Sequence, residues 1–217
     1  MTVVKSQFGP TLVQMLAPRS LAVRVGAAAF ALVLVVAVVA IALSTRPDET
    51  LVLEHEPVTF NFVYGPQFAR DEEGAIVALR HARGGLFLDG FVVQPLELPQ
   101  YRGVVSGMLP IYADGYIKGL RSRYRGFQFV GEGRTRINNG IGYQVTFRAR
   151  TGTRTLYGRH LLLVEEQPDG QRVGVVIELT STPAAGTPNA EEIGNHGALK
   201  TPLRSFRFGE DRKGGTA

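Results

Sequence analysis

The sequence predicts an α+β protein: an N-terminal transmembrane helix followed by one domain in which helices pack on a central antiparallel β-sheet. Three observations lead to this prediction. A single uncharged apolar run precedes every segment that is typical of a folded domain. Four β-prone segments, separated by tight turns, follow one another from Phe127 to Thr182. Segments with helical spacing flank this series, and an antiparallel sheet with an apolar face needs such a cover.

The apolar run extends from Val25 to Leu43 and contains no charged or strongly polar side chain. As a helix it is about 28 Å long, close to the ~30 Å thickness of the hydrocarbon core of a bilayer. A core helix of a soluble protein would show one polar face, and this run has none. We therefore expect a transmembrane helix over residues 25–43, with the lipid bilayer as its partner.

The same run could instead be a signal segment, because Ala40, Ile41 and Ala42 form a small-x-small cleavage pattern. Two features favour a retained anchor: the run is longer than a typical signal core, and a long leader precedes it. The chain contains no cysteine, so a lipoprotein anchor is excluded and no disulfide supports the domain. Cleavage after Ala42 stays open as the alternative.

The charges beside the run predict its orientation. Lys5, Arg19 and Arg24 precede it without any acidic residue, and positive residues resist translocation. We expect a single-pass protein of the cell membrane with its N-terminus cytoplasmic and its C-terminal domain outside. The expected organisation, in order, is a cytoplasmic tail over 1–24, the helix over 25–43, a polar linker over 44–57, the domain over 58–208 and a disordered tail over 209–217.

The domain opens with a strand in which Val58, Phe60 and Phe62 alternate with polar residues, ended by Gly65 and Pro66. Two further β-prone runs cover residues 75–82 and 85–98. Their turns are expected at Gly84–Gly85 and at Asp89–Gly90.

A change of period then predicts a helix. Apolar side chains recur at three- and four-residue spacing at Ala113, Tyr116, Ile117, Leu120 and Tyr124. Pro110 suits the first turn of this helix and Gly126 suits its end. Gly115 and Gly119 weaken it by up to ~1 kcal/mol each.

Four strands in an antiparallel meander follow, over 127–137, 142–150, 155–166 and 171–182, with turns at 138–140, 151–153 and 167–170. In the second strand Phe147 faces one way, while Arg148 and Arg150 share the face exposed to solvent. In the last strand Val173, Val175, Ile177 and Leu179 form the inward set. A closing helix is expected from Thr187 or Asn189, followed by a short strand over 203–208.

This order resembles the PsbP-like superfamily. The opening strand "VTFNFVYGPQF", the pair "RHLLLVEE…GVVIELTST" and the terminal "LRSFRF" carry the resemblance, which covers residues 55–208. It implies an α/β/α sandwich with a central antiparallel sheet. The superfamily includes extrinsic photosystem proteins and bacterial envelope proteins of unassigned role, and it shares no catalytic residue. The membrane anchor departs from its pattern, and no photosynthetic role is transferred.

The search for chemistry yields no catalytic, cofactor or metal residue. The four histidines, His55, His81, His160 and His196, lack the spacing of metal ligands. Ser106 lacks the surroundings of a nucleophile elbow. The glycines of residues 131–140 have no Lys-Ser/Thr pair and no following helix, so they form no phosphate loop. We expect no cofactor.

The charge distribution points to a binding surface. Residues 47–100 carry 3 basic and 9 acidic groups, a net of −6, while residues 101–160 carry 11 basic and 2 acidic groups, a net of +9. The candidate anion- or partner-binding residues are Arg121, Arg123, Arg125, Arg148 and Arg150. Guanidinium groups suit phosphates and carboxylates because they donate in a planar fork. The acidic region 47–100 could also neutralise them internally.

These observations predict a non-catalytic, membrane-anchored extracytoplasmic domain that binds an envelope protein or an anionic polymer or surface. Nucleic acid is not an expected partner, because the domain is expected outside the membrane, and such binding needs interleaved exposed aromatics or a helix that enters a groove. An envelope hydrolase with a site scattered in the sequence and a structural component of a membrane complex are the two alternatives. The ligand and the oligomeric state stay open.

Overall fold

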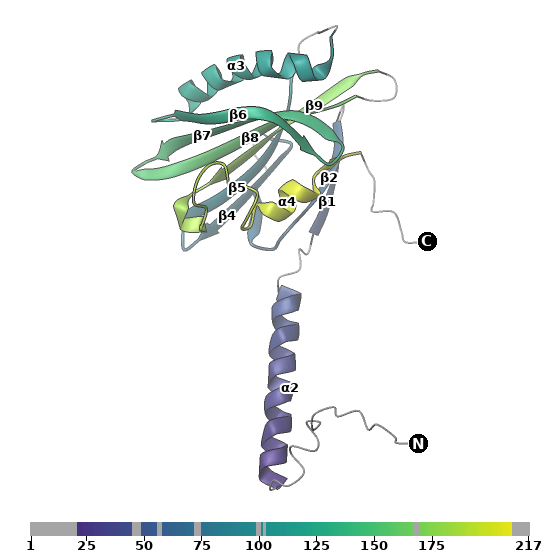
Figure 1. The fold of residues 1–217 in the computed structure, drawn as a ribbon, viewed down its shortest axis with the longest axis vertical. Coiled ribbons are helices and arrows are strands. Elements are labelled where there is room, and N and C mark those ends of the chain that lie inside the picture. The colour runs from purple at the N-terminus through teal and green to yellow at the C-terminus, as the bar shows by residue number, and fades with distance from the viewer. Residues whose placement is uncertain are drawn as a thin grey trace, which may run out of the picture. The chain divides into compact units, whose positions relative to one another are not determined.

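The computed structural model describes residues 21–44, 49–55, 58–71, 75–98, 101, 103–166 and 170–209. The chain divides into two compact units, Met1–Arg46 and Pro47–Ala217. The described part of the first unit is the helix α2, Leu21–Ser44. All other helices and strands belong to the second unit (Figure 1).

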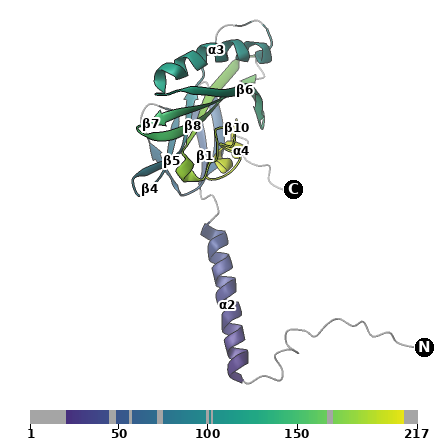
Figure 2. The same ribbon diagram turned by 60° about the vertical axis from the view of Figure 1, so that its left-hand side comes forward.

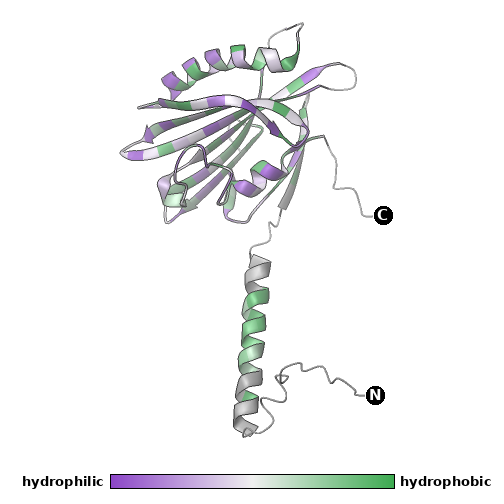
Figure 3. Ribbon diagram, viewed as in Figure 1, coloured by the Kyte–Doolittle hydropathy of each residue, from purple (hydrophilic) through white to green (hydrophobic). Residues whose placement is uncertain are grey.

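Helix α2 contains the predicted run 25–43 and begins four residues before it. Its described side chains, Val25 and residues 29–39, are exposed and hydrophobic (Figure 3). Within the residues that the structure describes, no helix reaches the length and hydropathy of a membrane span. Residues 1–20 of the expected cytoplasmic tail lie outside the described residues.

The second unit is built on a seven-stranded antiparallel sheet, here called the large sheet. Its strands in spatial order are β3 (Phe68–Asp71), β4 (Val77–Arg83), β5 (Leu86–Pro95), β9 (Arg172–Ser181), β8 (Arg154–Glu166), β7 (Gly140–Thr151) and β6 (Gln128–Ile137). The predicted meander of four strands is therefore confirmed as β6 to β9. Of its three turns, the last falls partly on residues 167–169, which lie outside the described residues.

A smaller sheet consists of β1 (Glu49–His55), β2 (Val58–Tyr64) and β10 (Arg207–Phe208), all antiparallel. The predicted alternation in β2 is confirmed, because every second residue from Val58 to Tyr64 is buried. Strand β1 occupies much of the segment 44–57, which we expected to be a polar linker. The apolar stretch within β1 explains the difference, since Leu51 pairs with Phe62 and packs against the buried core.

One predicted turn is wrong. Asp89 and Gly90 lie inside β5 and pair with β4 and β9. Gly90 gives room for close packing here, because a Cβ at this position would come within 2.7 Å of the Thr180 hydroxyl oxygen. A β-bulge between His81 and Ala82 adjusts the register of β4 at the same level. The turn at Gly84–Gly85 is confirmed, with both glycines at positive φ.

Helix α3 covers residues Val105–Arg123 and buries the predicted face, including Ala113, Ile117 and Leu120. It begins five residues before Pro110, which lies inside the helix instead of in its first turn. Burial of Met108 and Leu109 holds this extra turn in place despite the hydrogen bond that proline cannot make. The chain leaves the helix as predicted, with Gly126 in the left-handed region.

The closing helix is much shorter than expected: α4 covers only Lys200–Ser205. The 3-10 helix η1 (Pro183–Ala185) and an irregular segment precede it. Gly194 and Gly197 have positive φ, and these glycine conformations interrupt any helix through the segment. Asn189 makes the hydrogen bond typical of a helix cap, its side-chain oxygen accepting from the Glu192 amide at 3.0 Å, but turns and bends follow it in place of a helix.

The strand predicted over 203–208 is confirmed only at its end: β10 covers Arg207–Phe208, whereas residues 203–205 belong to α4. Gly209, which we assigned to the disordered tail, donates its amide to the carbonyl of Thr59 at 2.8 Å. The rest of that expected tail, residues 210–217, lies outside the described residues.

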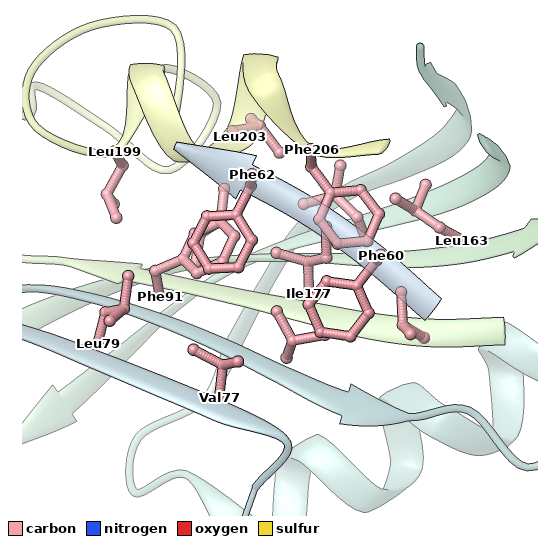
Figure 4. Close-up of a cluster of buried hydrophobic side chains, with 14 of the residues drawn as sticks. Phe60, Phe62, Val77, Leu79, Phe91, Leu163, Ile177, Leu199, Leu203 and Phe206 are labelled. Carbon is pink, nitrogen blue, oxygen red and sulfur yellow. The ribbon is translucent and has the colours of Figure 1, made fainter. Parts of the chain in front are cut away.

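The large sheet is covered on both faces (Figures 1 and 2). One face packs under α3, and the buried side chains there, including Phe147, Leu162 and Val176, are called the α3 core. The other face packs under the small sheet and α4, and its buried side chains are called the aromatic core. Figure 4 shows Phe60 and Phe62 of β2 between α4 and the large sheet. The layer opposite α3 is thus a small sheet joined by a short helix, where the expected sandwich has helices alone.

Candidate functional site

The five predicted arginines do not lie on one face of the domain. Arg121, Arg123 and Arg125 lie at the C-terminal end of α3 and just beyond it. Arg148 and Arg150 lie on β7, whose alternate residues Val145, Phe147 and Ala149 belong to the α3 core. Because side chains alternate along a strand, the two β7 arginines point away from α3. As predicted, both are exposed.

The two sets meet at one edge of the domain. The amide of Arg150 donates to the carbonyl of Arg125 at 2.8 Å. The intervening Gly126 passes close to Arg150, because a Cβ at Gly126 would lie 3.4 Å from its Cγ. The guanidinium of Arg148 lies 5.8 Å from the ring centre of Tyr157 on β8, a cation–π contact that orders the side chain.

Arg123 differs from the other four. Its Nη1 donates to Oε1 of Glu178 at 2.6 Å, and the side chain is half exposed. The remaining four, Arg121, Arg125, Arg148 and Arg150, are called the arginine surface. Among the described residues none of these four is within ion-pair distance of a carboxylate.

The acidic region 47–100 does not pair with these arginines in the part of the chain that the structure describes. Its one recorded ion pair joins Asp89 to His81, both within the region, at 2.9 Å. The internal neutralisation considered from sequence is therefore not seen among the described residues, several acids of this region being outside them.

A polar cluster lies under α3, inside the α3 core, and sequence reasoning missed it. His160 of β8 is completely buried, and its Nδ1 lies 2.7 Å from the hydroxyl of Tyr116. That hydroxyl donates to Oε1 of Glu178 at 3.4 Å, the same oxygen that Arg123 holds. Tyr116, Arg123, His160 and Glu178 thus form a chain from the helix surface to the sheet, called the polar cluster.

The protonation of the histidine nitrogens is linked to the direction of the Tyr116 bond. When the Tyr116 hydroxyl donates to Glu178, its oxygen accepts from Nδ1–H of His160, and Nε2 then carries no proton. Nε2 is buried without a hydrogen-bond partner among the described residues. The rings of Phe147 and Tyr124 meet the imidazole edge-on, with centroids 5.1 Å and 6.1 Å away.

The cluster favours neutral His160 and neutral tyrosines. Burial lowers the pKa of His160 to about 4; Glu178 opposes the shift and Arg123 adds to it. Burial and the nearby Glu178 carboxylate raise the pKa of Tyr116 well above its usual range, and raise that of Tyr124 to about 12. At neutral pH the cluster therefore holds one charge pair, Arg123 with Glu178, and uncharged groups around it.

An open groove of about 480 Å³ runs along the outer side of α3 above this cluster. It is lined by Ile111, Tyr112, Gly115, Tyr116, Gly119, Leu120 and Arg123. Its titratable groups are Tyr112, Tyr116 and Arg123. The side-chain bonds of Tyr116 and Arg123 turn toward His160 and Glu178. His160 itself has no exposed surface. A ligand in the groove would find no free general base within hydrogen-bonding reach in these four residues.

A second polar group, on the aromatic-core side, combines residue types found in hydrolases. Asp89 accepts from the Ser181 hydroxyl at 2.6 Å and bonds Nδ1 of His81 at 2.9 Å. In a catalytic triad the histidine stands between the serine and the acid, whereas here the acid stands between the other two. Ser181 is fully buried and also bonds Thr187 at 2.8 Å. This arrangement ties β4, β5 and β9 together and does not activate the serine.

No group of three or more histidine, cysteine, aspartate or glutamate side chains that could hold a metal ion gathers among the described residues. His55 lies in β1, and His81, His160 and His196 each contact a different acid. The one signal in the sequence for the polar cluster was the alternation of β8, which places His160 on the same side as Leu162 and Val164.

No protein-family model matches the sequence, and no curated protein matches it. Solved structures do match. One is the crystal structure of LpqN, described as involved in cell envelope biogenesis of Mycobacterium tuberculosis, with a TM-score of 0.50 and 10% identity. The match covers 74% of this chain and 90% of LpqN.

Another is the solution structure of the cyanobacterial PsbP protein (CyanoP) from Synechocystis sp. PCC 6803, also with a TM-score of 0.50 and 10% identity. It covers 76% of this chain and 95% of CyanoP. At this identity the likeness concerns the fold and carries no residue roles. The second unit of the protein has the PsbP-like fold that its sequence resembles.

Proposed function

We propose that this protein is a single-pass, membrane-anchored extracytoplasmic protein whose domain binds an anionic component of the cell envelope without catalysing a reaction. The observation that carries the proposal is the arginine surface: four exposed arginines without a carboxylate partner among the described residues. Guanidinium groups left unpaired on a surface are free to donate to phosphate or carboxylate oxygens.

The proposed location rests on the sequence and on one comparison. The run 25–43 is long enough for a bilayer, and the basic residues lie before it. LpqN, which shares the fold, is described as acting in envelope biogenesis. That description belongs to LpqN, and it supports an envelope location here only as part of this proposal.

The non-catalytic part of the proposal is supported by the way the polar groups are used. The Tyr116 hydroxyl and the Arg123 guanidinium bond to the sheet, and His160 is buried beneath them. The serine–aspartate–histidine group has the wrong order for nucleophilic catalysis.

Charge reversal tests the proposal. The full-length protein carrying Arg148→Glu and Arg150→Glu would be incubated with separated envelope fractions: lipid vesicles, wall or capsule polymers, and solubilised membrane proteins. We expect binding to at least one fraction to fall about tenfold or more, because two attractive contacts become repulsive. Lower affinity at higher salt would accompany it.

The matched control is Arg70→Glu with Arg83→Glu, which changes the net charge equally at two exposed arginines on β3 and β4. This control should bind like the unaltered protein. Equal binding of the Arg148/Arg150 variant and the control to every fraction would contradict the proposal.

A further inference from the structure

Strand β6 forms a long free edge of the large sheet. Among the strands that the structure describes, it is the last in the spatial order and pairs with β7 alone. It contains ten residues, against four in β3 at the opposite edge. Phe129 and Val130 are partly exposed along it. A free edge of this length presents unpaired backbone groups to any strand that can lie beside it.

The hairpin between β6 and β7 determines which backbone groups face outward. Its two-residue turn, Asn138–Asn139, is flanked by the pair Ile137 and Gly140. Residues that flank such a turn form a hydrogen-bonded pair, and these pairs alternate along the strands. Ile137 and the odd-numbered residues before it therefore direct their amides and carbonyls to β7. Glu132, Arg134 and Arg136 direct theirs to the free edge.

The side chains of these three residues are exposed. None of them has an ion-pair partner among the described residues. Glu132 and Arg134 point to the same side of the sheet and differ in sign. Charged side chains on an edge strand commonly hinder its pairing with another strand, unless opposite charges face each other across the new pair. On β6 the signs allow the strand to complement itself.

We propose that β6 pairs antiparallel with β6 of a second copy of this chain, with Gly133 opposite Gly133. In this register Glu132 of one copy lies opposite Arg134 of the other, and the symmetry repeats the contact. Both residues direct their backbone groups outward, so each pair is a hydrogen-bonded one. The two large sheets then continue into one another.

Charge selects this register over its neighbours. Shifting the pairing by two residues, the smallest shift that keeps the hydrogen-bonding groups in phase, has two outcomes. One shift places Glu132 opposite Glu132. The other places Arg134 opposite Arg134, and although it also sets Glu132 opposite Arg136, it adds a like-charge pair that the proposed register lacks. Like charges directly opposite each other destabilise a strand pair, whereas opposite charges stabilise it. Pairing stops at the β-bulge between Phe129 and Gly131, where the strand twists.

The absence of cysteine from the chain makes a direct test possible. Gly133→Cys places one thiol on each copy at the symmetric position. Gly133 would be a non-hydrogen-bonded pair, with its Cα atoms about 4.5 Å apart, which suits a disulfide. A Cβ at Gly133 has no heavy atom within 4 Å, so the substitution fits the folded domain. The control is Ala69→Cys, exposed on the other edge strand, β3.

The full-length protein in non-ionic detergent would be oxidised mildly and separated without reductant. We expect Gly133→Cys to form a covalent dimer at least about tenfold faster than Ala69→Cys. Adding Glu132→Arg or Arg134→Glu alone should remove this advantage, because each creates two like-charge contacts per dimer. Adding both together should restore it.

This design separates the β6 contact from any association through α2, since α2 is unchanged in every variant. A disulfide yield at Gly133 equal to that at Ala69 would overturn the proposal. The proposal would also be overturned if neither Glu132→Arg nor Arg134→Glu alone lowered the disulfide yield at Gly133→Cys. Failure of the two charge changes together to restore that yield would overturn it as well.

Discussion

The two faces of the large sheet are covered in different ways. The aromatic core is held together by contacts between apolar side chains. Phe62 of β2 lies 4.9 Å from Phe91 of β5, ring centre to ring centre, and both are fully buried. The α3 core is also apolar, but it contains the polar cluster centred on buried His160. Apolar packing has no dependence on protonation, whereas a buried imidazole has one. The ring contacts of the aromatic core are therefore independent of pH, whereas the α3 core depends on pH through His160.

The largest effect is expected on the aromatic-core side. Phe62→Ala should lower the free energy of unfolding by about 3–5 kcal/mol, because it removes a fully buried ring that contacts Phe60, Tyr64, Phe91 and Phe206. Urea denaturation followed by circular dichroism measures it. Ile111→Ala on α3 is the control, since Ile111 is 71% exposed, and should change stability by less than about 0.5 kcal/mol. A small effect of Phe62→Ala would contradict the assigned core.

The α3 side should respond to pH. Because the pKa of His160 is lowered to about 4, the unfolded chain, with an ordinary histidine pKa of ~6.5, takes up a proton between these values that the folded protein does not. Stability should therefore fall as pH falls from about 6.5 to 4, by roughly 3 kcal/mol from this residue.

The comparison variant for that prediction is His160→Gln, which cannot titrate. Denaturation midpoints measured from pH 7.5 to 4 should show a shallower decline for His160→Gln than for the unaltered protein. His196→Gln, at an exposed histidine, should leave the slope unchanged. If the slopes of all three proteins coincide, His160 is not buried as described.

A smaller effect is expected at the ion pair that connects α3 to the sheet. Glu178→Gln keeps the shape of the side chain and removes the charge that Arg123 contacts at 2.6 Å. We expect a loss of about 1–2 kcal/mol, because the half-exposed Arg123 can turn to water. A double-mutant cycle with Arg123→Ala measures the coupling directly. Additive effects of the two substitutions would show that the pair does not stabilise the helix.

The smallest expected effect is a gain in stability, where the substitutions above cause a loss. Gly115→Ala should stabilise α3 by about 0.5–1 kcal/mol, because glycine costs conformational entropy in a helix and a Cβ there meets no atom within 4 Å. Thermal unfolding would show it as a raised midpoint. Gly158→Ala is the contrasting control, since its Cβ would overlap the ring of Phe147 and should destabilise the protein. A destabilising Gly115→Ala would mean that the groove side of α3 is not open.

The sequence was most informative where a period was regular. The alternation of β2 and of the meander predicted the strands and the exposure of Arg148 and Arg150. It was least informative where several glycines decide the path. The segment after Thr187 has capping residues and acids typical of a helix start, yet Gly194 and Gly197 at positive φ keep it irregular.

The site was only partly predictable. Arg121 lies at the end of α3 and Arg150 lies in β7, 29 positions later in the sequence. Charge counts cannot show on which face of the domain each arginine lies. The polar cluster joins residues of α3, β8 and β9, so no local spacing reveals it. The alternation of β8 does place His160 inward, and an inward histidine beside Leu162 was the available clue.

The central claim is that the domain is displayed outside the cell on a retained helix, where the arginine surface can meet an anionic envelope component. The most direct measurement is protease treatment of intact cells that carry the full chain with a different tag at each end. The account predicts that the C-terminal tag is lost while the N-terminal tag remains, on a membrane-bound fragment. A protected C-terminal tag, or a soluble form that begins after Ala42, would contradict it.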